Sequence, residues 1–149
     1  MSEFKPQMTV AEIEAFLDRE FPQIHDGGRC FFVDSVAPGE ASLRLRTAER
    51  HLRPGGTVSG PTLFTLADLV AYVAILAHIG PVALAVTTNL SINFLRKPEP
   101  GDLIGHCRIL KLGRSLVVVE VTIRADGHPA AVAHAVATYS IPPRRNAVS

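Results

Sequence analysis

The residues with the clearest chemical potential open a long apolar segment, RPGGTVSGPTLFTLADL, residues 53–69. Its glycines let backbone approach a ligand closely, because no Cβ intervenes. Pro61 suits a first helical turn, where its missing N–H is not needed, and Ser59 or Gly60 is the predicted N-cap. Free N–H groups and the helix dipole favour an anion or a polarised carbonyl oxygen there, as in an oxyanion hole. The same glycines also suit a plain tight turn.

One carboxylate, Asp68, lies inside the apolar stretch that follows, on the helical face of Thr65 and Tyr72. Burying an ionised carboxylate without partners costs several kcal/mol. The position therefore favours a general base or a nucleophile, the alternative being a structural Asp bonded to a hydroxyl or to backbone N–H. Gly60 is about 12 Å away along the helix axis at 1.5 Å per residue, so a second subunit would have to supply one half of a shared site.

The composition fits one folded domain. The chain has 149 residues, of which 47% are hydrophobic and 19% charged. We predict one domain over residues 1–149, with flexible ends at about 1–8 and 142–149. The net charge of +1, with scattered Lys and Arg, excludes an electrostatic footprint for nucleic acid. Cys30 and Cys107 lack metal-ligand spacing and no secretory pattern opens the chain, which together predict a cytoplasmic protein.

Two further classes are disfavoured. The apolar stretch 63–79 is interrupted by polar residues and is too short for a membrane span, so we predict no membrane partner. The histidines show no HxxxH or HExxH spacing, so we predict no metal and no cofactor. His51 stands two residues before Arg53, beside the proposed site, and is a candidate for a substrate contact.

The elements around these residues indicate an α+β fold. A capping box, Thr9-Val-Ala-Glu12, predicts a short helix to about Glu20, and Gly80-Pro81 ends the long central helix. Period-two patterns predict strands at 29–36, 40–46, 84–96, 102–113, 115–124 and 129–141, the last four forming a meander. Because the long helix is apolar nearly all round, we expect the antiparallel sheet to curl around it. Strand alternation turns Thr88, not Thr87, toward this helix.

Three segments carry a family resemblance: PGGTVSGPTLFTLADL, VTTNLSINFLRKPEPGD and LGRSLVVVEVTIRADGHPAAVAHAVATY. From about Ala48 to Tyr139 the chain resembles the hot-dog-fold acyl-CoA thioesterases, most closely the phenylacetyl-CoA and 4-hydroxybenzoyl-CoA thioesterase-like branch. The resemblance implies a curved antiparallel sheet of five to six strands wrapped around one long helix. It also implies hydrolysis of an acyl-CoA thioester to free acid and coenzyme A.

The resemblance assigns roles to single positions. Asp68 matches the family's catalytic carboxylate, which activates water or attacks the thioester. Gly60 matches the glycine whose N–H polarises the thioester carbonyl. Thr87 matches a strand hydroxyl that holds the attacking water in some members, and Thr88 stays a candidate on strand periodicity. In the family, subunits pair edge to edge and each site takes Asp from one chain and glycine from the other, which implies a homodimer or a dimer of dimers.

The chain also departs from the family pattern. Many members have Asn at Arg53 and His-Gly-Gly at Ser59-Gly60-Pro61. Arg53 is a candidate for binding phosphate or carboxylate, and Ser59 for a weaker hydrogen bond. The remaining substrate-binding candidates are His51, Thr65, Tyr72, Thr88, Arg96 and Arg114, the two arginines for coenzyme A phosphates. The departures leave open a non-catalytic acyl-CoA binding or sensing protein, and a dehydratase or hydratase is a third, weaker reading because no His–acid pair is evident.

Overall fold

The structure is a computed structural model, and it describes residues 4–143. The predicted flexible ends, about 1–8 and 142–149, therefore lie partly outside the described residues. Within the described part, the N–H groups of Gln7 and Met8 both donate to the Ala77 carbonyl oxygen, at 2.6 and 3.3 Å. These two bonds tie the chain before the first helix to the central helix.

The element order follows the predicted sequence of helices and strands closely. The elements are α1 (Val10–Glu20), η1 (Pro22–His25), β1 (Phe31–Ala37), β2 (Glu40–Arg46), η2 (Glu49–His51), α2 (Gly60–Ile79), β3 (Val86–Phe94), β4 (Asp102–Leu112), β5 (Leu116–Ala125) and β6 (Ala131–Ser140). The predicted capping box at the start of α1 is confirmed: Thr9 Oγ1 accepts the Glu12 N–H and Glu12 Oε1 accepts the Thr9 N–H.

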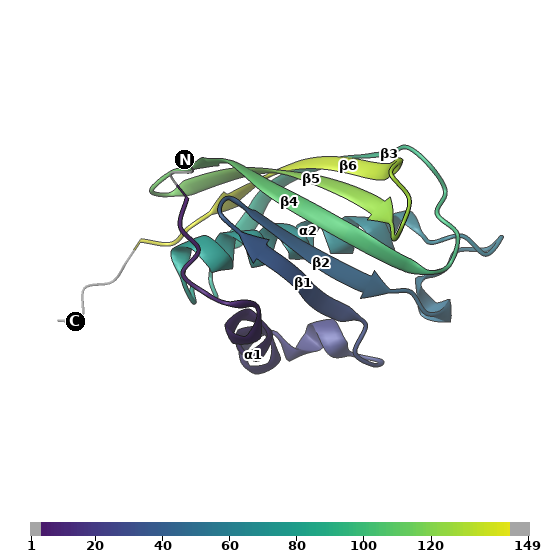
Figure 1. The fold of residues 1–149 in the computed structure, drawn as a ribbon, viewed down its shortest axis with the longest axis horizontal. Coiled ribbons are helices and arrows are strands. Elements are labelled where there is room, and N and C mark those ends of the chain that lie inside the picture. Colours follow the sequence, from purple (N-terminus) through teal and green to yellow (C-terminus); the bar gives the residue numbers. More distant parts are fainter. Residues whose placement is uncertain (1–3, 144–149) are drawn as a thin grey trace.

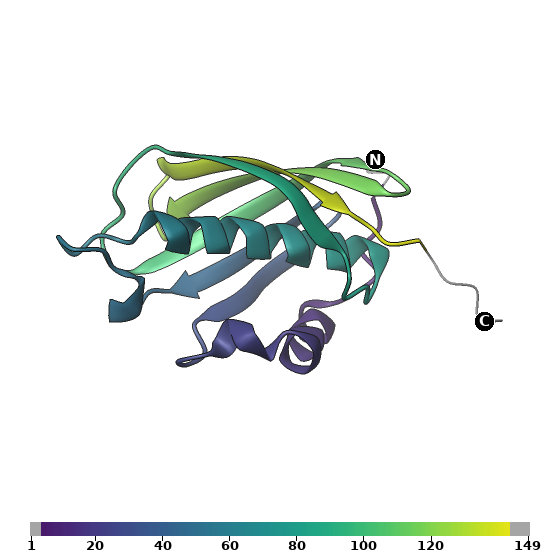
Figure 2. The same cartoon turned by 180° about the vertical axis from the view of Figure 1, so that it is seen from behind.

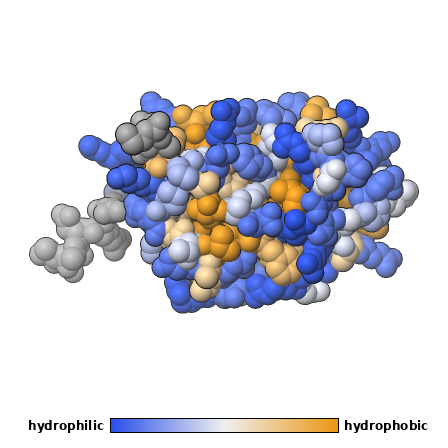
Figure 3. All heavy atoms as spheres, viewed as in Figure 1, coloured by the Kyte–Doolittle hydropathy of each residue, from blue (hydrophilic) through white to orange (hydrophobic). Residues whose placement is uncertain are grey.

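The strands form one antiparallel sheet in the order β1-β2-β4-β5-β6-β3. Figure 1 shows the face of this sheet that points away from α2, and Figure 2 shows the opposite face, where α2 lies in the hollow of the sheet and β3 curls around it. The curved sheet around one long helix, with a short helix before it, confirms the predicted fold class. The face seen in Figure 3 is mostly hydrophilic with small apolar patches, as expected for the solvent side of the sheet.

The predicted four-strand meander is wrong for β3. This strand pairs with β6 and lies at the edge of the sheet, whereas β4 pairs with β2 and with β5. Residues 95–101 carry the chain from one edge of the sheet to its middle. Alternation of side chains assigns the two faces of a strand but not its neighbours, and the open edge of β2 takes β4 as its partner.

The central helix is buried on almost all sides. Its side chains from Leu63 to His78 are covered by the sheet, apart from a short stretch around Phe64, Thr65 and Asp68. By length and composition α2 could cross a membrane, yet most of it is enclosed by the fold, as in the core helix of a soluble protein. Each fully buried Leu, Ile or Val contributes about 1.5–3 kcal/mol through the hydrophobic effect. The helix that carries Asp68 is thus a rigid element.

Close contact between α2 and the sheet depends on Gly105 in β4. A Cβ at this position would lie 3.2 Å from Leu66 Cγ and 3.3 Å from Val70 Cγ1. We therefore expect Gly105→Ala to lower the free energy of unfolding by about 1–3 kcal/mol, because the added methyl group overpacks the helix against the sheet. Urea denaturation followed by circular dichroism measures this, and unchanged stability would show that the helix shifts without cost.

Candidate active site

The first turn of α2 leaves a single N–H group available. Ser59 is the N-cap, as predicted: its Oγ accepts the Thr62 N–H at 3.3 Å, and its carbonyl oxygen accepts the Leu63 N–H at 3.2 Å. Pro61 has no N–H. Among residues 4–143 no acceptor pairs with the Gly60 N–H, which is therefore the group of this turn that is free to bind an anion or a carbonyl oxygen.

The Ser59 hydroxyl is already used within the protein. Besides capping the helix, it shares a 2.8 Å hydrogen bond with Thr62 Oγ1, which in turn donates to the His51 carbonyl oxygen at 3.3 Å. With its proton engaged in this chain of bonds, Ser59 serves the fold of the loop. The structure thus gives Ser59 a capping role, and its contact with substrate stays a prediction.

Asp68 carries the most distinctive geometry in the molecule. Thr87 Oγ1 donates to Asp68 Oδ1 at 2.5 Å, and the Tyr139 hydroxyl donates to the same oxygen at 2.8 Å. Within residues 4–143 no donor reaches Oδ2, and Oδ2 is not among the buried atoms left without a partner. Hydrogen bonds to a charged group contribute about 1.5–3 kcal/mol each, so the two hydroxyls offset much of the cost of desolvating this half-buried carboxylate.

A β-bulge decides which threonine meets Asp68. In the pairing of β3 with β6, Thr87 lies opposite Tyr139 and Asn89 opposite Thr138, so Thr88 is the extra residue. The bulge turns Thr87 toward α2, while exposed Thr88 bonds the Thr138 carbonyl oxygen at 3.1 Å. The prediction that Thr88 points to the helix is therefore wrong, because strict alternation does not hold across a bulge.

A cavity of about 550 Å³ opens beside Asp68. Its wall is formed by α2, by the start of β3, and by the segment that joins α1 to η1. The lining residues are Glu20, Phe21, Gln23, Ile24, Phe64, Thr65, Asp68, Leu69, Tyr72, Ala83, Ala85, Val86, Thr87 and Tyr139. The structure thus brings four predicted site residues together here, namely Thr65, Asp68, Tyr72 and Thr87.

Three aromatic rings form one wall of this cavity. Tyr72 and Tyr139 stack with centroids 6.4 Å apart, and Phe21 meets Tyr72 edge-on at 6.2 Å. Burial raises the pKa of Tyr139, and the nearby Asp68 charge raises it further. Burial also raises the pKa of Tyr72, whose hydroxyl donates to the Ala83 carbonyl oxygen at 3.0 Å. Both phenols therefore remain protonated donors at neutral pH.

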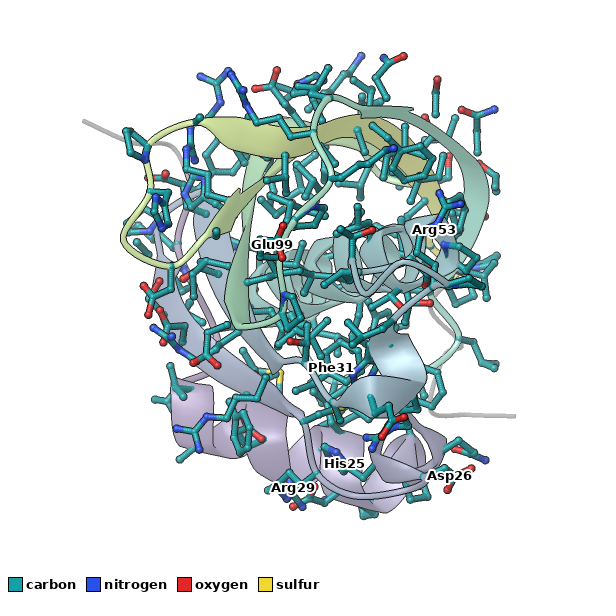
Figure 4. All side chains as sticks on the ribbon, turned by 90° about the vertical axis from the view of Figure 1, so that its right-hand side faces the viewer. His25, Asp26, Arg29, Phe31, Arg53 and Glu99 are labelled. Carbon is teal, nitrogen blue, oxygen red and sulfur yellow. The ribbon has the colours of Figure 1, made fainter. Side chains whose placement is uncertain are left out.

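Gly60 lies outside the Asp68 cavity. It borders an apolar hollow of about 530 Å³ shared with Pro61, Phe64, Thr65, Ile92 and Phe94. It also borders a smaller one of about 330 Å³, lined in part by Arg53, Arg96 and Lys97. Figure 4 looks at this end of the molecule, with Arg53 beside the start of the central helix. One chain therefore does not place Gly60 and Asp68 in a common cavity.

His51 has a structural environment. Its Nδ1 accepts the Ala48 N–H at 2.8 Å, so its proton is on Nε2, 3.8 Å from Cys30 Sγ. Burial lowers the pKa of His51, as does the charge of Arg50, which keeps the ring neutral. It lines a separate cavity of about 220 Å³ and lies neither with Gly60 nor with Asp68. The contact of His51 with substrate stays a prediction.

The two arginines expected at coenzyme A lie at opposite ends of β6. The Arg96 N–H donates to the Val132 carbonyl oxygen, whereas Arg114 lies in the turn whose Ser115 carbonyl accepts the Ile141 N–H. At 3.3 Å per strand residue this separates them by about 30 Å. Arg96 thus shares the Gly60 side with Arg53, and Arg114 does not.

Tyr139 is the functional residue that reasoning from the sequence missed. Its signal is present in β6, where the helix-facing positions read Ala133, Ala135, Ala137 and Tyr139, all buried. Three small side chains followed by one large side chain with a polar tip indicate a hydroxyl that must reach a partner inside.

In the described part of the chain no His, Cys, Asp and Glu side chains form a group of three that could hold a metal ion.

Known proteins match this chain across most of its length. The profile of the "Thioesterase superfamily" matches residues 55–132. A crystal structure from Silicibacter sp. TM1040, assigned as a thioesterase, is 50% identical, covers 94% of this chain and 96% of its own, and superposes with a TM-score of 0.85. The smu.793 protein of Streptococcus mutans, bound to acetyl CoA, is 25% identical over 79% of this chain and 93% of its own, with a TM-score of 0.68.

A relative from Saccharolobus solfataricus extends the likeness to an archaeal protein. It is assigned as an esterase and is 27% identical over 136 residues, which make up 91% of this chain and 87% of that protein. The resemblance read from the sequence motifs is therefore confirmed at the level of the superfamily and of hydrolase activity.

Proposed function

We propose that this chain, which belongs to the thioesterase superfamily, hydrolyses an acyl-CoA thioester to a free acid and coenzyme A. The observation that carries the proposal is the Asp68 carboxylate, which lines the cavity, is anchored at Oδ1 by two hydroxyls and has no donor from residues 4–143 at Oδ2. A carboxylate held in this way has one oxygen free for chemistry and an adjacent space for an acyl group.

The reaction follows from this arrangement in two possible forms. As a general base, Oδ2 takes a proton from water, and the resulting hydroxide adds to the thioester carbon. As a nucleophile, Oδ2 adds to that carbon itself. Departure of the sulfur then leaves an anhydride between the acyl group and Asp68, which water later cleaves. In either form the carbonyl oxygen gains negative charge, which a free N–H at a helix N-terminus stabilises. The sulfur then leaves as the thiolate of coenzyme A.

The free N–H comes from a second chain in this proposal. β3 is an edge strand with exposed apolar residues at both ends: Val86 is 53% exposed and Phe94 52%. The unpaired backbone groups and apolar side chains of such an edge favour pairing with another strand. Asp68 and Thr87 lie near the Val86 end, whereas Gly60 lies near the Phe94 end. Antiparallel pairing of two β3 strands about a two-fold axis brings opposite ends together.

Such a homodimer joins the two halves of the site. The Asp68 cavity of one chain would meet the Gly60 hollow of the other, which resolves the separation of about 12 Å along one helix. A further pairing of dimers is compatible with the largely polar outer face of the sheet. Cytoplasmic localisation stays part of this proposal.

Coenzyme A would be held on the Gly60 side by cations. Arg53, Arg96 and Lys97 border the hollow next to Gly60, and guanidinium and ammonium groups suit phosphate oxygens. The acetyl CoA bound to the Streptococcus mutans protein, which has a similar fold, supports this class of ligand. We assign these three residues to the phosphates of coenzyme A. Arg114 of the same chain is not included, because it lies at the opposite end of β6 from Arg96.

One observation favours the non-catalytic alternative, an acyl-CoA binding or sensing protein. Pro61 removes an N–H from the first turn, and the Ser59 hydroxyl is engaged in capping, so a single donor remains for the carbonyl oxygen. Fewer donors mean weaker stabilisation of the developing charge. The two readings differ in turnover, which the next experiment measures.

Replacing Asp68 with Asn tests the proposed chemistry. Asp68→Asn keeps an oxygen that accepts from Thr87 and Tyr139, but it removes the charge that activates water or attacks the thioester. We expect kcat to fall by about 10²–10⁴-fold, measured as release of free coenzyme A across a panel of acyl-CoA thioesters. The matched control is Asp34→Asn, an exposed carboxylate on β1, with wild-type turnover. Turnover by Asp68→Asn at the wild-type level would exclude this mechanism.

Two substitutions at Gly60 test the oxyanion contact. Gly60→Pro removes the N–H, and proline is tolerated at the first helical position. Loss of one oxyanion donor costs about 10²–10³-fold in kcat. Gly60→Ala keeps the N–H and adds a Cβ that lies 3.4 Å from Phe94 Cζ, so its kcat should stay within about tenfold of wild type. Equal losses in the two variants would argue for packing rather than for the N–H.

A further inference from the structure

The hydroxyl of Tyr139 contacts Asp68 but makes or breaks no bond in the proposed reaction. We infer that Tyr139 is a positioning residue, which holds the Asp68 carboxyl group in the orientation that presents Oδ2 to the thioester. This inference rests on the proposed function, because it concerns the same carboxylate. It adds a second hydroxyl, from a different strand, to the one on Thr87 that the family resemblance suggests.

The geometry fixes rotation of the carboxyl group. Tyr139 on β6 lies directly opposite Thr87 on β3, and both hydroxyls donate to Asp68 Oδ1, at 2.8 and 2.5 Å. Two donors on one oxygen oppose rotation about the Cβ–Cγ bond, since rotation would exchange Oδ1 for Oδ2 and break both bonds. The carboxyl group is thereby held with Oδ1 bonded, while Oδ2 has no donor from the described residues and is not a buried atom without a partner.

The Tyr139 hydroxyl also lies 2.8 Å from the main-chain carbonyl oxygen of Asp68. A phenol has one proton, so it is placed between two acceptors of the same residue. While the carboxylate is charged, Oδ1 is the stronger acceptor. Once Oδ2 has taken a proton from water, the phenol can turn its proton to the carbonyl oxygen without moving its ring. One hydroxyl therefore serves both protonation states of Asp68.

The ring of Tyr139 has a separate task. It is buried to 2% exposure, and it stacks on Tyr72 in the cavity wall. Burial also raises the pKa of the phenol, so it remains a donor over the working pH range. Because the ring packs and the hydroxyl bonds, a substitution that removes the hydroxyl alone separates the two tasks.

Tyr139→Phe performs this separation. We expect kcat to fall by about 10- to 100-fold, the loss of one hydrogen bond to a charged group. KM should stay within about twofold, since the ring that lines the cavity is retained. The matched control is Thr138→Val, at the preceding residue of β6, whose side chain lies on the other face of the strand; this variant should leave kcat unchanged. A changed KM with wild-type kcat would overturn the inference.

An NMR measurement that needs no turnover completes the test. With ¹³C-labelled aspartate, the Asp68 carboxyl signal should change in Tyr139→Phe and stay unchanged in Thr138→Val, because only the first variant loses a donor to Oδ1. An unchanged Asp68 signal in folded Tyr139→Phe overturns the inference, as does wild-type kcat in a chain that hydrolyses thioesters.

A second variant supplies a reading even where Tyr139→Phe does not fold. With ¹³Cζ-labelled tyrosine, the Tyr139 signal should change in Asp68→Asn, whereas the signal of Tyr72, bonded to the Ala83 carbonyl, should not. An unchanged Tyr139 signal in Asp68→Asn overturns the inference. If the wild type hydrolyses none of the thioesters, the proposed function fails on its own, and the two NMR measurements still decide whether Tyr139 holds the carboxyl group.

Discussion

The structure depends on a carboxyl group, that of Asp68, which the core helix places in a half-buried position. Two hydroxyls, from Thr87 and Tyr139, converge on one oxygen of Asp68 and offset the loss of water around it. They come from β3 and β6, neighbouring strands that are far apart in the sequence. The sheet must therefore curl over α2, and β3 must lie beside β6, before the helix can carry an acid at this position.

The same requirement explains irregular features elsewhere in the fold. A bulge after Thr87 turns that hydroxyl inward, and the small residues of β6 leave room for the large ring of Tyr139 at the end of the strand. The start of α2 differs from the region of Asp68, because it presents a hydrogen-bond donor and not an acceptor. There a cap and a proline use up or remove every N–H of the first turn except that of Gly60. One end of β3 thus lies near the Asp68 carboxyl group and the other near the free N–H of Gly60.

Much of the fold could be predicted from the sequence because its signals are local. The capping box before α1, the Ser59 cap and Gly80 stop of α2, and the alternation in β4 to β6 all act over a few residues. The place of β3 could not be predicted, because strand alternation does not choose neighbours. The orientation of Thr88 was predicted wrongly for a related reason. One extra residue in a bulge exchanges the faces to which the side chains on its two sides point.

At the candidate site, the sequence indicated the chemistry of Asp68 and Gly60 but not their surroundings. Tyr139 was missed because its partner lies 71 positions earlier in the chain and on another element. The ring of His51 is hydrogen-bonded to the Ala48 N–H and lines a cavity separate from those of Gly60 and Asp68, although the residue is close to Arg53 in the sequence. Long-range pairing, which decides the case of Tyr139, leaves no local pattern in the sequence.

The central claim is that Asp68 of one chain acts on a thioester bound to Gly60 of another, and subunit mixing tests it most directly. Two inactive proteins, Asp68→Asn and Gly60→Pro, are unfolded together and refolded as a mixture. In mixed dimers one of the two sites combines an intact Asp68 with an intact Gly60, so statistical mixing predicts recovery to about a quarter of wild-type activity. A mixture no more active than its separate components would contradict the shared site.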